Sequence, residues 1–189
     1  MCAIYRKRCK RYDKPGDAHY LTFSCFRRQP FLADARLAAV FCEVIDEARR
    51  KEPFSLWAYV LMPEHAHLIL RPQDGSAISR ILRFIKRPMF DRAIVWARRN
   101  DPELLARMRS EDGGSGRAHH FWLAGGGYDR NLRSPRDVHE KIHYVHANPV
   151  RRRLVERPAD WPWSSYRAWH EGASEPIAID RDSMPMLRG

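Results

Sequence analysis

The tripeptide His65-Ala66-His67 is the feature of this sequence that points most directly to chemistry. In a β-strand, side chains two residues apart project from the same face, so both imidazoles can reach one metal ion. The apolar residues at 68–70 support the strand assignment. The chain contains nine histidines, so the motif by itself leaves open that the two rings are half-exposed and bind nothing.

A second candidate set lies at 142–149, which reads Ile-His-Tyr-Val-His-Ala-Asn-Pro. Tyr144 and Asn148 are four residues apart, so a helix places them on one face. The amide oxygen of Asn148 can complete a two-histidine metal site and bring the phenol of Tyr144 beside the ion. His146 is rotated away from that face in a regular helix and is a weaker ligand candidate. Taken alone, Tyr144 is better explained as a packing aromatic, as most helical aromatics are.

Together the two motifs predict a tyrosine that acts as a nucleophile. The phenol of tyrosine has a pKa near 10 and needs activation at neutral pH. A divalent ion held by His65, His67 and Asn148 would bind a scissile phosphate and place its phosphorus in line with Tyr144. Attack would link the DNA to the tyrosine and free a hydroxyl, so that rejoining needs no ATP. Candidates for the proton acceptor are His143 and His146.

The charge of the chain favours a polyanionic partner. Lys and Arg number 34 against 23 Asp and Glu, a formal net charge of +11. The basic residues cluster within 1–30, 80–99 and 151–157, and each phosphate that they neutralise releases condensed counterions. The predicted phosphate contacts are Arg80, Arg83, Lys86, Arg87, Arg151 and Arg152. A generally basic surface without a partner is the alternative.

The elements that must position these residues follow an α+β order. Hydrophobic periodicity and turn residues predict strands at 19–26, 54–62, 65–70 and 121–123 and helices at 34–51, 76–99 and 134–148. The expected N-caps are Asp34, Ser76, Asp101 (of a short helix) and Ser134. Pro88 is expected to end or kink its helix. This order predicts a ferredoxin-like antiparallel sheet with helices mainly on one face.

Length and composition predict one domain with tails. The chain has 189 residues, 44% of them hydrophobic, which is enough for a packed core without disulfides. We expect a basic arm at 1–18, a domain at 19–170 and a tail at 171–189. The four cysteines form no C-x-x-C pair, which argues against a zinc finger. No membrane-spanning run or secretory signal is recognised, so we expect a cytoplasmic, nucleoid-associated protein.

The run 59–69, Tyr-Val-Leu-Met-Pro-Glu-His-Ala-His-Leu-Ile, resembles the motif of the IS200/IS605-type single-tyrosine transposases, which are HUH endonucleases. The run 144–150, Tyr-Val-His-Ala-Asn-Pro-Val, is similar to their tyrosine helix in the form typical of the REP-associated tyrosine transposases. Segments within 121–130 and 161–166 also resemble that branch. The resemblance covers roughly residues 15–170.

The resemblance implies a metal-dependent endonuclease and strand transferase that cleaves single-stranded DNA beside a REP-like hairpin through a 5′-phosphotyrosine. It makes Tyr144 the nucleophile and His65, His67 and Asn148 the ligands of Mg²⁺ or Mn²⁺, although these ligands equally allow Zn²⁺. The family often has Gln where this chain has the shorter Asn148. The protein would act as a monomer or homodimer and would not bind membranes.

Two other interpretations remain open at this point. A zinc hydrolase could use the His-x-His motif, but it would need a further ligand and a carboxylate, and only Glu64 is nearby in the sequence. A non-catalytic nucleic-acid-binding module would explain the charge and leave Tyr144 a structural residue. The aromatic run at 161–169 is interpreted as packing over the sheet rather than as a stacking platform for bases.

Overall fold

The computed structural model describes residues 16–110, 118–125, 127–174 and 176–186. The expected basic arm lies almost wholly outside these residues, and the division of the chain into three segments stays a prediction. Four strands form one antiparallel sheet in the order β2-β3-β1-β4. The strands are β1 (Ala18–Ser24), β2 (Phe54–Met62), β3 (His65–Pro72) and β4 (Tyr128–Leu132).

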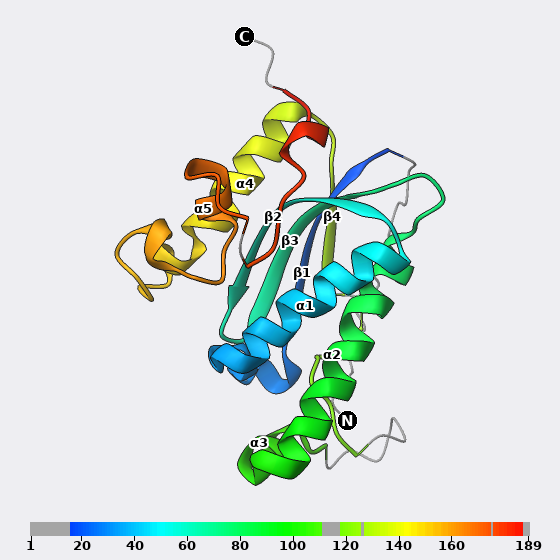
Figure 1. Cartoon of the computed structure of the whole chain (residues 1–189), viewed down its shortest axis with the longest axis vertical. Coiled ribbons are helices and arrows are strands. Elements are labelled where there is room, and N and C mark those ends of the chain that lie inside the picture. The colour runs from blue at the N-terminus through cyan, green and yellow to red at the C-terminus, as the bar shows by residue number, and fades with distance from the viewer. Residues whose placement is uncertain (1–15, 111–117, 126, 175, 187–189) are drawn as a thin grey trace, which may run out of the picture.

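The helices of the described chain cover both faces of this sheet (Figure 1). They are α1 (Ala35–Lys51), α2 (Ile78–Asn100), α3 (Pro102–Met108), α4 (Pro135–Arg151) and α5 (Tyr166–His170). Helices α1 and α2 pack on the face that carries Phe23 and Leu68. Helix α4 packs on the opposite face, against Tyr20 and Ile69. The predicted α+β fold with a ferredoxin-like antiparallel sheet is confirmed, while the expected placement of helices mainly on one face holds for α1 and α2 but not for α4.

Three of the four predicted helix caps are confirmed. The side chains of Asp34, Asp101 and Ser134 each accept a hydrogen bond from a backbone amide in the first turn of their helices. The predicted cap at Ser76 is wrong, because the N-cap of α2 is Ala77. The Ala77 amide donates instead to Oε1 of Glu52 at 2.9 Å. A carboxylate at the end of α1 therefore accepts the hydrogen bond that a side chain at the N-cap would otherwise accept.

Both helices with an internal proline continue beyond it. Helix α2 runs through Pro88 to Asn100 and does not end there. Helix α4 runs through Pro149 to Arg151, three residues past the predicted end. Proline has no amide hydrogen for the carbonyl four residues earlier, which here is Val145. Nδ2 of Asn148 lies 3.4 Å from that carbonyl oxygen and partly replaces the missing donor.

The fourth strand lies at 128–132 and not at 121–123, where it was predicted. Trp122 forms only an isolated bridge with Cys25, whereas Tyr128–Leu132 pairs with β1. The segment has three polar residues in a row, Asp129, Arg130 and Asn131, so it lacks the apolar alternation by which strands are recognised. Gly127 immediately precedes this strand with φ of +75°, and a Cβ there would lie 2.2 Å from the carbonyl oxygen of Thr22.

The chain after α4 packs against the free edge of β2. Indole Nε1 of Trp161 donates to the carbonyl of Leu61 at 2.9 Å, and that of Trp169 donates to Trp57 at 2.8 Å. These bonds confirm that the aromatic run serves packing. Further along, the carboxylate of Asp180 accepts hydrogen bonds from Arg49 and from the amide of Leu56. Within the described residues, no helix is both long and apolar enough to span a membrane.

Candidate active site

A cleft of about 400 Å³ opens between the sheet and α4, at the ends of β1 and β3. It contains the predicted nucleophile and all three predicted metal ligands. The residues that line it are Thr22, Ser24, Arg28, His65, His67, Tyr144, Asn148, Arg151 and Arg152. Two motifs almost 80 residues apart in the sequence therefore meet in one cavity.

The two histidines of β3 face the cleft together. Their Nε2 atoms lie 2.9 Å apart, and the side chains are buried. Two nitrogen ligands bonded to one ion at about 2.0–2.1 Å are separated by roughly 3 Å, so this spacing suits a shared cation. When both rings carry their proton on Nδ1, the Nε2 lone pairs face each other and repel, and a cation between them removes that repulsion. The donor set thus fits a metal ion.

The ring of His67 is held by two hydroxyl groups of β1. Its Nδ1 lies 2.7 Å from Oγ1 of Thr22 and 2.9 Å from Oη of Tyr20, and the Tyr20 ring stacks on it. Burial raises the pKa of Tyr20 to about 12, so this phenol stays protonated. Burial, assisted by the charges of His65 and Lys141, lowers the pKa of His67 to about 3. The imidazole is therefore neutral, as a metal ligand must be.

The ring of His65 is oriented by a carboxylate. Its Nδ1 donates to Oε1 of Glu64 at 3.1 Å, and Arg152 donates to the same oxygen at 2.9 Å. Burial lowers the pKa of His65, although Glu64 opposes the shift. Burial also acts to raise the pKa of Glu64, but His65 and Arg152 bring it below its ordinary value. A proton fixed on Nδ1 leaves Nε2 of His65 open to a cation.

Tyr144 and Asn148 lie one turn apart on the face of α4 that closes the cleft. The Tyr144 ring is 37% exposed, and its centroid lies 6.3 Å from that of His67. Nζ of Lys141 and Cζ of Arg151 each lie 5.0 Å from the centroid of the Tyr144 ring. Nδ2 of Asn148 donates to the Tyr144 carbonyl at 2.8 Å, which leaves Oδ1 as the amide atom available to a ligand.

Neither histidine considered as a proton acceptor lines the cleft. His146 is buried elsewhere, with Nε2 at 2.8 Å from Oγ of Ser165. Its burial lowers its pKa to about 3. This position agrees with the prediction that His146 is rotated away from the face of Tyr144. His143 lies on the exposed surface of α4.

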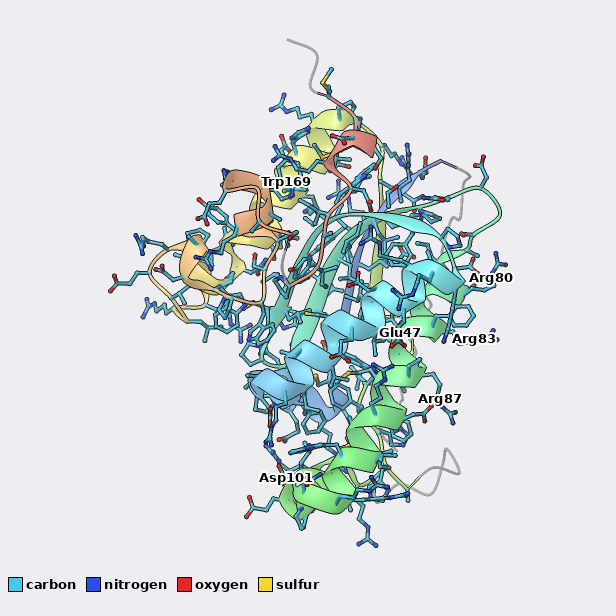
Figure 2. All side chains as sticks on the ribbon, in the orientation of Figure 1. Glu47, Arg80, Arg83, Arg87, Asp101 and Trp169 are labelled. Carbon is cyan, nitrogen blue, oxygen red and sulfur yellow. The ribbon has the colours of Figure 1, made fainter. Side chains whose placement is uncertain are left out.

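The six predicted phosphate contacts fall into three groups. Arg151 and Arg152 line the cleft, whereas Arg83, Lys86 and Arg87 line a separate hollow beside α2. Nε of Arg80 donates to the carboxylate of Glu52, with both N–O distances 2.9 Å. Figure 2 shows Arg80, Arg83 and Arg87 along the side of α2 that faces away from α1. Their roles in binding DNA stay predictions.

Three residues that line the cleft, Thr22, Ser24 and Arg28, escaped the sequence reasoning, as did Tyr20, which contacts the ring of His67. Thr22 and Tyr20 share a face of β1, and Thr22 is the register partner of His67. The alternation of β1 would reveal them once its pairing with β3 is known. Arg28 enters from a short turn in which Arg27 and Arg28 have φ of 52° and 54°. No local sequence pattern marks it.

The donor set favours a cation that accepts an amide ligand. In the described ranges, no group of three or more His, Cys, Asp or Glu side chains is placed to hold a metal ion. A third protein ligand would therefore be Asn148, since Glu64 is engaged by His65 and Arg152. A catalytic zinc site normally has three His, Glu, Asp or Cys ligands, so the zinc-hydrolase interpretation loses support.

Comparison with known proteins finds relatives of the chain both in sequence and in fold. No protein-family model matches the chain. The chain is 24% identical over 162 residues to a REP-associated tyrosine transposase of Escherichia coli strain K12, which covers 83% of this chain and 81% of that protein. Its fold is similar to that of a REP-associated tyrosine transposase solved with a REP hairpin, with a TM-score of 0.64. That match has 22% identity and covers 95% of this chain and 98% of the other. The resemblance indicated by the motifs is confirmed.

Proposed function

We propose that this chain, a relative of the REP-associated tyrosine transposases in sequence and fold, cuts and rejoins single-stranded DNA beside a hairpin with the help of a divalent metal ion. The observation that carries the proposal is the convergence of His65, His67, Asn148 and Tyr144 on one cleft. The charge of that cleft supports a phosphate ligand, because Arg28, Arg151 and Arg152 are all part of its lining.

The metal ligands in this proposal are Nε2 of both histidines and Oδ1 of Asn148. The ion, Mg²⁺ or Mn²⁺, would polarise the scissile phosphate and offset the negative charge that develops on it. The chain orients its ligands in advance. Thr22 and Tyr20 hold His67 and Glu64 holds His65, so the ring nitrogens point into the cleft before DNA binds.

The step assigned to Tyr144 is an in-line displacement at phosphorus. Its phenolic oxygen forms the new P–O bond and loses its proton, while the 3′ oxygen of the neighbouring nucleotide leaves and takes up a proton. The products are a 5′-phosphotyrosyl link and a free 3′ hydroxyl. Attack by another 3′ hydroxyl reverses the step and transfers the strand. Lys141 and Arg151 flank the ring and are placed to attract the incoming phosphate.

A denaturing gel tests the proposal directly. The full chain is incubated with a hairpin-bearing single-stranded oligonucleotide and Mn²⁺ or Mg²⁺, and a covalent protein–DNA adduct is expected. Tyr144→Phe should form no adduct and should still shift the DNA on a native gel. Tyr128→Phe is the matched control, because Tyr128 is exposed but outside the cleft, and it should form the adduct. Cleavage without an adduct would identify a hydrolase, and a native shift alone would identify a binding module.

A further inference from the structure

Arg28 enters the candidate active-site cleft from a turn with an unusual backbone. The turn is η1 (Phe26–Arg28), in which Arg27 and Arg28 have φ of 52° and 54°. Residues other than glycine adopt this left-handed conformation at a cost in free energy, and it persists only where the surrounding structure enforces it. Strain of this kind gathers at functional sites. The side chains at this turn are therefore candidates for a function that offsets the strain.

Hydrogen bonds tie the turn to the hairpin that joins β2 and β3. The amide of Cys25 donates to the Glu64 carbonyl at 2.8 Å, and the amide of Leu32 donates to the Pro63 carbonyl at 2.9 Å. These two bonds lie on either side of Arg28 in the chain. The backbone that positions the first histidine of the cleft thus also fixes the conformation of Arg28.

The two arginines of the turn have different surroundings. Arg27 lies with Cζ 5.0 Å from the centroid of the Phe26 ring and is not part of the cleft lining. Arg28 lines the cleft together with the two histidines of β3. Burial lowers the pKa of His65, and the charges of Arg152 and Arg28 act in the same direction, so the charge of Arg28 reaches this ring. Of two similarly strained arginines, it is therefore Arg28 that lies beside the proposed reacting groups.

The three guanidinium groups of the cleft differ in the contacts that they already make. Arg152 donates to Oε1 of Glu64 at 2.9 Å, and Arg151 lies over the ring of Tyr144. Among the residues that the structure describes, the guanidinium of Arg28 has neither a carboxylate partner nor an aromatic ring beneath it. A guanidinium presents its N–H donors as a fork that matches two oxygens of one phosphate. Arg28 can therefore bind a phosphate in the cleft without giving up another partner.

We propose that Arg28 is a catalytic residue of the strand-transfer step. Its guanidinium donates hydrogen bonds to the non-bridging oxygens of the scissile phosphate and stabilises the negative charge that grows on them while the phenol of Tyr144 attacks. The inference rests on the proposed function, whose bonds it leaves unchanged: the Tyr144 oxygen bonds to phosphorus, and the bond from phosphorus to the 3′ oxygen breaks. Arg28 stays protonated throughout and transfers no proton.

The rate of adduct formation at saturating protein separates this role from DNA binding. The full chain, in excess over a hairpin-bearing single-stranded oligonucleotide, is mixed with Mn²⁺, and the adduct is followed with time on a denaturing gel. In Arg28→Ala the rate should fall about 100–1,000-fold, as for the loss of one donor to a developing charge, while the affinity for DNA changes by less than about threefold. Arg28→Lys keeps the charge without the fork, so its rate should lie between the two.

Arg27 supplies the matched control, because it has the same left-handed backbone and lies outside the cleft lining. Arg27→Ala should react at the wild-type rate. Arg27→Gly and Arg28→Gly both relieve the positive φ, so each should keep or raise the midpoint of thermal unfolding. Of these two, Arg28→Gly alone should react slowly. A slow variant that is at least as stable as the wild type does not owe its defect to misfolding.

A neutral phosphate analogue tests the charge directly. In a methylphosphonate at the linkage that the wild-type chain cuts, a methyl group replaces one non-bridging oxygen and removes the charge that Arg28 is proposed to stabilise. The ratio of the wild-type rate to the Arg28→Ala rate should therefore shrink from about 100-fold or more to less than about tenfold.

Three results would overturn the inference and leave the proposed function in place. They are a wild-type rate in Arg28→Ala, an equal loss of rate in Arg27→Ala, and an unchanged ratio of rates on the methylphosphonate. A wild-type chain that forms no adduct would overturn the proposed function, and the role of Arg28 with it.

Discussion

The candidate active-site cleft and the hollow beside α2, which we call the α2 groove, meet at the end of β1, yet they are built in different ways. The cleft combines buried side chains from β1, β3 and α4, and hydrogen bonds fix both histidine rings. The α2 groove is lined by exposed cations of one helix and by one irregular segment.

The difference separates two kinds of function. A reacting group must be held within a fraction of an ångström, which requires buried partners from several elements. A surface that holds a strand through its phosphates and base faces tolerates movement of each side chain. Substitutions should therefore affect the rate of chemistry in the cleft and the affinity for DNA in the α2 groove, where Arg83, Lys86 and Arg87 are predicted phosphate contacts. The four predictions below test this separation, from the largest expected effect to the smallest.

The largest effect is expected from His67→Ala. This substitution removes one proposed metal ligand, so adduct formation should fall by more than the roughly 100-fold that the loss of an outer-shell partner costs. Binding of Mn²⁺, measured by calorimetry, should be lost as well. Lys86→Ala in the α2 groove should leave metal binding unchanged. Undiminished Mn²⁺ affinity in His67→Ala would show that the cleft does not bind metal through this ring.

Gly127→Ala should destabilise the end of β1 that both surfaces share. Its Cβ would lie 2.2 Å from the Thr22 carbonyl oxygen, and φ at this residue is +75°. We expect the free energy of unfolding in urea to fall by about 3 kcal/mol or more. Gly125→Ala is the control, with φ of +95° but no atom within 4 Å of the added Cβ. Its cost should be about 1–2 kcal/mol, and equal costs would mean that the contact with Thr22 is relieved by movement.

Thr22→Val should loosen the orientation of the His67 ring without removing a proposed metal ligand. Valine has the same shape but cannot accept a hydrogen bond from Nδ1 of His67, which lies 2.7 Å from the Thr22 hydroxyl. Metal affinity and the rate of adduct formation should fall about 10–100-fold, while affinity for the single-stranded oligonucleotide stays the same. Ser24→Ala, on the same face of β1, should have a much smaller effect on metal affinity. Similar losses in both variants would argue against a special role for the bond to His67.

Cys25 provides the smallest prediction, a dependence of stability on pH at the junction of the two surfaces. Burial raises the pKa of its thiol from 9.0 to about 12. Between these values the unfolded chain loses the thiol proton and the folded chain keeps it, so stability falls as pH rises. The contribution is at most about 1.4 kcal/mol per pH unit.

The measurement is urea unfolding at several pH values from 8 to 11, compared between the wild-type chain and Cys25→Ala. The wild type should lose stability more steeply above pH 9, because the variant has no thiol to titrate at this position. Parallel curves would show that the thiol is as accessible to ionisation in the folded chain as in the unfolded one.

Much of the candidate site could be predicted from local sequence. The shared face of His65 and His67 follows from the two-residue period of a strand, and that of Tyr144 and Asn148 from the period of a helix. The caps Asp34, Asp101 and Ser134 likewise depend on a few adjacent residues. The fourth strand was predicted at the wrong place because its polar residues show no apolar alternation. The cap at Ser76 was wrongly predicted because the partner of the Ala77 amide is Glu52, at the end of α1.

The amino-acid sequence by itself determined which residues are candidates for the chemistry, by their types and spacing, and on which face of its own element each one lies, because the face depends on the local backbone period. The tertiary structure alone decided which supports they receive and which cations share a surface. Thr22 beside His67, Arg28 in the cleft, and the separation of Arg83 from Arg151 depend on strand pairing and helix packing between distant segments. Such contacts leave no periodic trace in the chain, since the free energy of packing depends on the partner as well as on the residue itself.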